Sequence, residues 1–106
     1  LNLFFFCTSI SFSLSKMKNI LFEKCILVDA DFQECEMDNV RFHGCDLTGA
    51  SFLGAKFKEV DLRESNIENI KISPEQFRGI IIEPSEAIYL IGATGAKVMY
   101  PETEDL

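Results

Sequence analysis

The residues with the most chemical potential in this sequence are three regularly spaced cysteines and its single histidine. Cys25, Cys35 and Cys45 lie ten positions apart, and His43 stands two positions before the last of them. Thiolates and imidazole nitrogens are preferred zinc ligands, and a cysteine or serine beside a histidine can act as a nucleophile. Either chemistry requires these side chains to converge, so it depends on the elements that position them.

A run of acidic residues is the second candidate for function. Five acids and no base occur between residues 29 and 38, namely Asp29, Asp31, Glu34, Glu36 and Asp38. Such a run keeps a surface soluble and protects sheet edges, or it presents phosphate-like charges to a basic partner. The pattern leaves both interpretations open. Seventeen acids against ten bases give a net charge of −7, which argues against direct, nonspecific binding of nucleic acid.

The chain that carries these residues follows a five-residue repeat. A large apolar residue occupies every fifth position from Phe12 to Ile72, and a mostly small or β-branched residue stands two positions before each. Residues separated by two point to the same side of an extended segment, so each repeat predicts a short strand with two inward side chains. The remaining positions include a turn. The predicted turn residues are Asn19, Asp29, Glu34, Asn39, Gly44, Gly49, Gly54 and Glu59.

Four such repeats close a coil of square cross-section, so residues twenty positions apart should stack. Phe12, Phe32 and Phe52 then share one inward column. Outside, two columns alternate in sign, and at roughly 4.8 Å between stacked strands their opposite charges become neighbours. These columns are Lys16/Glu36/Lys56 and Lys18/Asp38/Lys58. The sequence therefore predicts an all-β solenoid of about three coils around a single core.

This geometry bears directly on the cysteines and the histidine. Cys25 and Cys35 fall on opposite walls and His43 points outward, so four zinc ligands do not converge and no nucleophile faces His43. We expect Cys25 and Cys45 to stack as reduced thiols. The segment "GATGAK" lacks P-loop spacing. We therefore predict no catalytic residue, no metal and no cofactor, and a protein that is not an enzyme.

The repeat ends after Ile72, and the following residues predict a cap. In "SPEQFRG" a serine precedes proline, with glutamine three positions on, which is typical of a capping box. Extended residues 80–82, a helix opened by Pro84 and ended by Gly92 or Gly95, and a short strand "KVMY" should follow. Either the tail caps the solenoid alone or it also forms a homodimer contact. The candidate contact residues are Ile88, Tyr89, Leu90, Ile91, Val98 and Met99.

The repeat resembles the pentapeptide-repeat family, with "CDLTG", "ASFLG", "AKFKE" and "VDLRE" as good matches. The resemblance covers residues 10–72 and implies a right-handed quadrilateral β-helix. It implies much less about function, because one solenoid carries many roles.

The tail is similar to the C-terminal region of the quinolone-resistance (Qnr and MfpA-type) members. The residues concerned are "SPEQF", the apolar strand after it, and "PSEAIYLI" with its following glycine. That resemblance implies a C-terminal homodimer that binds DNA gyrase or topoisomerase IV as an acidic DNA mimic and confers fluoroquinolone resistance. The alternative is a generic repeat scaffold, or a fragment of one, that mediates other protein contacts.

These observations predict two segments. Residues 1–72 form the β-helix, with 1–9 an irregular or truncated first coil, and residues 73–106 form the cap and dimerisation segment. The apolar start "LNLFFFCTSISFSLS" has no basic n-region or cleavage site and is too short and too rich in serine to span a bilayer. We therefore expect a cytoplasmic protein with no membrane contact. Cys7 falls in phase with the repeat, which favours continuation of the coils toward the N-terminus.

Overall fold

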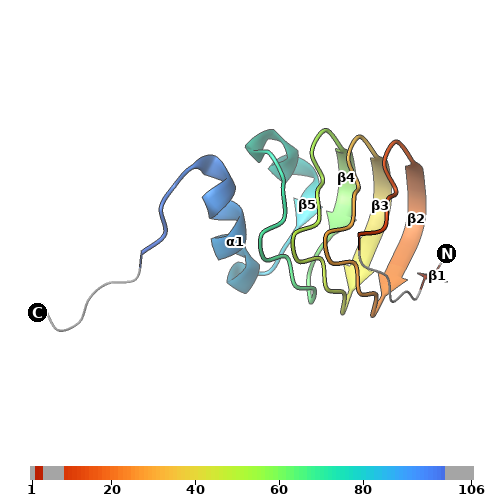
Figure 1. Ribbon diagram of the computed structural model, residues 1–106, viewed down its shortest axis with the longest axis horizontal. Coiled ribbons are helices and arrows are strands. Elements are labelled where there is room, and N and C mark those ends of the chain that lie inside the picture. The colour runs from red at the N-terminus through yellow and green to blue at the C-terminus, as the bar shows by residue number, and fades with distance from the viewer. Residues whose placement is uncertain (1, 4–8, 100–106) are drawn as a thin grey trace, which may run out of the picture.

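The computed structural model describes residues 2–3 and 9–99 and shows a parallel β-solenoid with a helical cap at its C-terminal end (Figure 1). Five strands pair in chain order within one parallel sheet. They are β1 (Asn2–Leu3), β2 (Lys16–Glu23), β3 (Glu36–His43), β4 (Lys56–Asp61) and β5 (Ile80–Ile81). The predicted solenoid of about three coils is confirmed.

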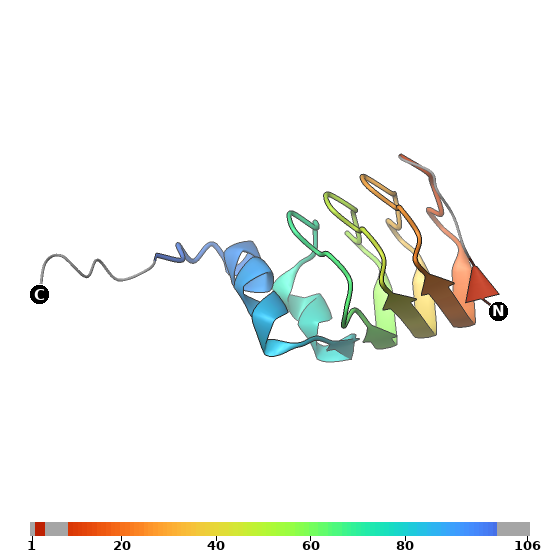
Figure 2. The same cartoon turned by 90° about the horizontal axis from the view of Figure 1, so that it is seen from below.

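Each coil has four walls, which we name after the large inward residue of the second coil. Strands β2 to β4 run along the Met37 wall and turn the corner onto the Phe42 wall (Figure 2). Isolated bridges such as Ser11↔Asp31 and Ile26↔Asp46 hold the Phe32 and Leu47 walls. The pairing keeps a register of twenty, as in Met17↔Met37. The predicted columns are therefore confirmed.

The corners between walls are left-handed backbone positions. Positive φ angles recur at every fifth residue from Ser9 to Asn69, and only Gly44, Gly49 and Gly54 among these are glycines. All eight turn positions predicted from the sequence belong to this series. The chain can turn a corner every five residues because this conformation bends it sharply at a single residue.

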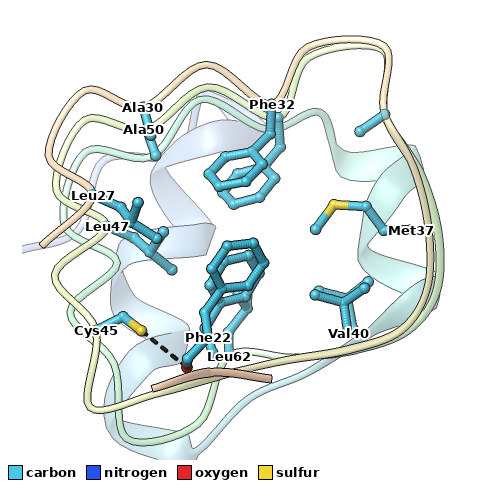
Figure 3. Close-up of a cluster of buried hydrophobic side chains, with 14 of the residues drawn as sticks. Phe22, Leu27, Ala30, Phe32, Met37, Val40, Cys45, Leu47, Ala50 and Leu62 are labelled. Atoms are coloured by element: carbon cyan, nitrogen blue, oxygen red, sulfur yellow. Dashed lines mark hydrogen bonds between the residues drawn. The ribbon is translucent and has the colours of Figure 1, made fainter. Parts of the chain in front are cut away.

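Phenylalanine rings fill the square interior. Phe32 and Phe52 stack with ring centroids 5.0 Å apart, and Phe22 and Phe42 stack at 4.7 Å. The two columns meet edge to face, with Phe32 and Phe42 at 5.5 Å. Figure 3 looks along the coil and shows labelled side chains from all four walls pointing inward. Offset stacks and edge contacts are the favourable aromatic arrangements, so the repeat builds a continuous aromatic core.

Several small inward residues also donate a side-chain hydrogen bond to a backbone carbonyl of the preceding coil. Cys45 Sγ donates to the carbonyl of Phe22 at 3.2 Å (Figure 3), and Cys35 Sγ to that of Phe12 at 2.9 Å. Ser65 Oγ makes the equivalent bond to the Phe42 carbonyl at 2.8 Å. Polar atoms at these positions are thus satisfied within the core.

The N-terminal strand departs from the twenty-residue register. β1 pairs Leu3 with Phe22, a spacing of nineteen, whereas Ser9 already donates its N–H to the Val28 carbonyl in the standard pattern. β1 and Ser9 therefore follow different registers, nineteen and twenty. Cys7, which the sequence places in phase, lies outside the described residues.

The last coil ends in a short helix instead of a strand. The 3-10 helix η1 (Pro74–Gly79) begins after Ser73, whose N–H donates to Gln76 Oε1 at 2.8 Å. Gln76 Nε2 donates to the carbonyls of Phe52 and Ala55, both at 2.7 Å. This side chain thus takes the Ala55 carbonyl, which a backbone N–H of the next coil would otherwise pair as Lys56 pairs Cys35, and it adds a second donor to the Phe52 carbonyl, which already accepts the Ala55 N–H. The predicted capping box is confirmed, and η1 ends at Gly79 as expected.

The remaining tail is helical and packs against the end of the solenoid. After β5 come the 3-10 helix η2 (Pro84–Glu86), the helix α1 (Ala87–Ile91) and the 3-10 turn η3 (Gly92–Thr94). Gly95 ends this region with φ 89°. Leu90 is buried in the core cluster. Within the described ranges, no helix has the length and apolar character needed to cross a membrane.

The predicted strand "KVMY" is wrong for residues 97–99, which are irregular and exposed; Tyr100 lies outside the described residues. A strand needs a neighbour for its backbone groups. The sheet ends at β5, which the helical segments separate from this stretch, and within the described chain no strand is left to pair with it.

Candidate functional site: the outer walls and the cap

The structure places the three cysteines inside the coil and the histidine outside it. Cys25, Cys35 and Cys45 are buried, unbridged thiols. Burial raises the pKa of Cys45 to about 11, which keeps this thiol protonated and unreactive. His43 lies on the outside, where Nε2 contacts Glu64. Among residues 9–99, no cluster of histidine, cysteine and acidic side chains is arranged to hold a metal ion.

The five acids of the run do not form one strip along the solenoid. They follow the second coil around two walls, because consecutive repeats occupy consecutive walls. Asp31 lies on the Phe32 wall, with Asp29 and Glu34 at its two corners. Glu36 and Asp38 lie on the neighbouring Met37 wall.

Two corner acids of the Phe32 wall pack against glycines of the next coil, which have no side chain to obstruct them. Asp29 lies over Gly49 and Glu34 over Gly54, where an added Cβ would meet their carboxylates. Asp31 Oδ1 accepts the N–H of Gln33 at 2.9 Å. Asp29 and Glu34 are exposed, so this wall presents carboxylates to solvent.

The acids of the Met37 wall lie among lysines instead. Glu36 pairs in register with Lys16 and Lys56, and Asp38 with Lys18 and Lys58. The Lys16 Nζ–Glu36 Oε2 distance is 3.8 Å. This pair is largely exposed and contributes about 0–1 kcal/mol. The predicted alternation of sign is therefore present, and its energetic value is small.

The charge consequently differs from wall to wall. Counted without the corners, the outward residues of the Met37 wall and η1 are Lys16, Lys18, Lys56, Lys58 and Arg78 against Glu36, Asp38 and Glu75, which gives 5 − 3 = +2. Counted in the same way, the Phe32 and Leu47 walls carry Asp31, Asp46 and Glu68 against Lys71, which gives 1 − 3 = −2. Their corners add Asp29, Glu34 and Glu64 against Lys24. The acidic surface of this chain is thus one-sided.

A charged cluster that sequence reasoning missed joins the Phe42 wall to the cap. Asp61 forms a bidentate pair with Arg63, with Oδ2 2.8 Å from Nη2, and this hydrogen bonding lowers the pKa of Asp61. Glu83 Oε1 accepts the Glu64 N–H at 2.6 Å. Glu86 is 5% exposed, and its Oε2 has no hydrogen-bond partner. Burial raises the pKa of Glu86. The sequence signal that could have predicted this cluster is "EPSE" at residues 83–86, because Glu83 and Glu86 have the spacing of a capping box.

The predicted contact residues of the tail divide between inside and outside. Leu90 is buried against the solenoid, so it belongs to the cap and is not available at the surface. The other five are exposed: Ile88, Tyr89, Ile91, Val98 and Met99, the last by 70%. An apolar groove of about 220 Å³ beside α1, lined by Phe77, Ile80 and Ile91 among others, adjoins them. The cap thus leaves apolar side chains uncovered.

Comparison with solved structures returns QnrB1, a plasmid-mediated fluoroquinolone resistance protein, in several forms. Two trypsin-treated variants share 15% identity with this chain at TM-scores of 0.46 and 0.45, over 91% and 92% of this chain and 80% of theirs. Full-length QnrB1 gives 15% and 0.44, over 88% of this chain and 81% of its own. No curated protein matches the sequence. The family model for the pentapeptide repeat region matches residues 15–90. Since this match spans most of the sequence and the structure shows the repeat coil by coil, the chain belongs to the pentapeptide-repeat family.

Proposed function

We propose that this chain is a non-enzymatic binding protein that occupies the DNA-binding surface of a type II topoisomerase, DNA gyrase or topoisomerase IV, and so protects it from fluoroquinolones. The observation that carries the proposal is the one-sided acidic rod. Its two shorter dimensions are 27 and 21 Å, comparable with the width of a DNA duplex. The similarity of the tail sequence to the quinolone-resistance members supports the same function.

The face that meets the enzyme is the Phe32 wall with its corners, not the Met37 wall. A surface that binds DNA is basic, so it attracts Asp29, Asp31 and Glu34 and repels the lysines beside Glu36 and Asp38. About three coils at roughly 4.8 Å span about 14 Å, over which B-DNA carries about eight phosphate charges. Six acids and two lysines on the Phe32 and Leu47 walls and their corners leave a net charge of 2 − 6 = −4, which is half of that number.

A gyrase supercoiling assay with and without ciprofloxacin tests the function. The wild-type protein should inhibit supercoiling or protect the enzyme from the drug at micromolar concentration. Asp29→Asn/Asp31→Asn/Glu34→Gln should weaken the effect about tenfold, since each charge contributes up to about 1 kcal/mol at a complementary surface. The matched control Glu36→Gln/Asp38→Asn should retain it. An absence of inhibition, protection and gyrase binding in the wild type would leave only the scaffold interpretation.

The exposed residues of the cap are proposed to join two copies. Ile88, Tyr89, Ile91, Val98 and Met99 are large apolar side chains exposed on one segment of the chain, and a two-fold contact would bury them. Sedimentation should show twice the monomer mass. Ile91→Asp should shift the protein to monomer, whereas Leu53→Asp, an equally exposed position on the Phe32 wall, should not. A monomeric wild type at all concentrations would contradict the dimer.

A further inference from the structure

A groove on the Met37 wall lies where the third coil meets η1. Its volume is about 540 Å³, and it is lined by residues 55–59 of β4 and its flanks and by Glu75, Gln76, Arg78 and Gly79. It therefore runs along β4, between a strand and a helix. No part of the proposed function uses it, because it lies on the basic wall.

The groove exists because Gln76 turns inward. If the register of twenty continued, the side chain of residue 76 would stack on Lys56 outside this wall, and that of residue 78 would stack on Lys58. Gln76 instead donates to the carbonyls of Phe52 and Ala55, so Lys56 has no side chain beneath it on the outside. Gly79 allows η1 to approach closely, since a Cβ there would collide with the backbone of Phe57. The floor is thus formed by backbone and by partly buried Phe57.

Three cations border this groove and form no ion pair within the described residues, although Glu36 and Asp38 are the cross-strand neighbours of two of them. Lys56, Lys58 and Arg78 take part in none of the ion pairs found among the described residues, whereas Lys16 on the same wall is paired with Glu36. Glu59 and Glu75 also line the groove, so its local charge is 3 − 2 = +1. Neither acid lies within ion-pair distance of the three cations. The cations are therefore available to an external anion.

We infer that this groove binds an extended acidic peptide segment whose carboxylates alternate along the chain, as in Glu-x-Glu. Lys56 and Lys58 are alternate residues of a strand and so project from the same face about 7 Å apart. Carboxylates at alternate positions of an extended peptide have the same spacing, so a peptide laid along β4 meets both lysines in register. Arg78, from η1, faces the same peptide from the other side of the groove and offers a bidentate donor.

The net charge of −7 does not prevent this binding. At about 0.1 M salt, charges more than about 10 Å apart are largely screened. The acidic Phe32 and Leu47 walls lie on other sides of a body whose shorter dimensions are 27 and 21 Å. The field at the groove is therefore set by its own residues and by the other charged residues of the Met37 wall, where Lys16 and Lys18 are accompanied by Glu36 and Asp38.

Fluorescence anisotropy with a labelled Ser-Glu-Ser-Glu-Ser peptide and the full chain tests the inference. The peptides Ser-Gln-Ser-Gln-Ser and Ser-Glu-Glu-Ser-Ser serve as controls for charge and for spacing. Lys56→Gln/Lys58→Gln should weaken binding about fivefold, since each lost exposed pair contributes up to about 1 kcal/mol. The matched control Lys16→Gln/Lys18→Gln removes the same charge from the same wall two coils away and should leave binding within about twofold.

Three outcomes would overturn the inference. The first is an equal loss in both double variants, which would indicate nonspecific attraction to the wall. The second is equal binding of the two acidic peptides or equal competition by inorganic phosphate, which would exclude the alternating register. The third is an absence of binding at millimolar peptide. All four lysines are exposed, and far-UV circular dichroism checks that each variant is folded. The result is independent of any effect on gyrase.

Discussion

Replacing Phe42 with alanine should be among the most damaging single changes to this fold. The Phe42 side chain is fully buried and its ring contacts three others: Phe22 at 4.7 Å, Phe32 at 5.5 Å and Phe52 at 6.1 Å between centroids. Burial of such a side chain contributes about 1.5–3 kcal/mol, and each aromatic pair adds about 0.5–1.5 kcal/mol. Since neighbours relax into the cavity only in part, we expect a loss of about 3–5 kcal/mol.

Phe57→Ala is the matched control for this prediction. Phe57 carries the same side chain in the same repeat position, but it is only partly buried and makes one ring contact, at 5.6 Å to Phe52. Its replacement should cost about 1–3 kcal/mol. The two variants therefore separate the contribution of the continuous ring column from that of the residue type.

Urea unfolding followed by far-UV circular dichroism measures both losses. With an m-value of about 1–3 kcal/mol/M, the midpoint for Phe42→Ala should fall by roughly 1–3 M, and by clearly less for Phe57→Ala. An equal or smaller loss in Phe42→Ala would refute the reasoning. It would mean that stability resides in the outer ladder of backbone hydrogen bonds and not in the ring columns.

Four further predictions concern single positions. Gly79→Ala should destabilise the protein by about 1–3 kcal/mol, because the new Cβ collides with the backbone of the coil above. Gly92→Ala, with open space around it and helical backbone angles, should stabilise by about 0.4–1 kcal/mol in the same urea unfolding experiment. Cys45→Ser should retain stability within about 1 kcal/mol, whereas Cys45→Val should lose about 1–3 kcal/mol, because valine cannot donate the hydrogen bond that Cys45 Sγ makes to the Phe22 carbonyl; comparable urea midpoints for the two would contradict this. Because burial raises the pKa of Glu86 above that of the unfolded chain, its contribution is fully present below the unfolded value near 4.5 and is lost as pH rises through the folded value. Unfolding free energies measured from pH 4 to 7 should therefore fall less steeply in Glu86→Gln than in wild type, and parallel curves would exclude this role.

The walls, columns and corners could be predicted because each is determined by the residue types within a single five-residue repeat. A large residue at every fifth position, a small one two before it, and Asn, Asp or Gly at the corner fix which side chains point inward at each step. Stacking at a spacing of twenty then follows from closure of the square. Met17↔Met37 and Val40↔Val60 pair as that spacing requires.

The features that could not be predicted depend on contacts between distant parts of the chain. The inward turn of Gln76, and the groove it opens, could be predicted only by knowing that the carbonyls of Phe52 and Ala55 lie within reach of its side chain. The acids at 29–38 read as one run along the sequence, but consecutive repeats face different directions, so the structure separates Asp31 from Asp38. The strand expected at 97–99 failed for a similar reason, since an extended sequence forms a strand only beside another.

Because of the left-handed corners, the number of repeats also determines the direction in which the later part of the chain faces. Each repeat advances the direction of the chain by a quarter turn, so four repeats return it to the same wall. Adding or removing twenty residues in mid-solenoid would lengthen the rod and leave the cap, the groove and the acidic walls of both ends facing as before. Adding or removing five would rotate everything beyond that point by ninety degrees and present a different wall of the C-terminal end beside the acids of the second coil. The relative direction of the surfaces at the two ends is therefore encoded by repeat number modulo four, independently of what each repeat contains.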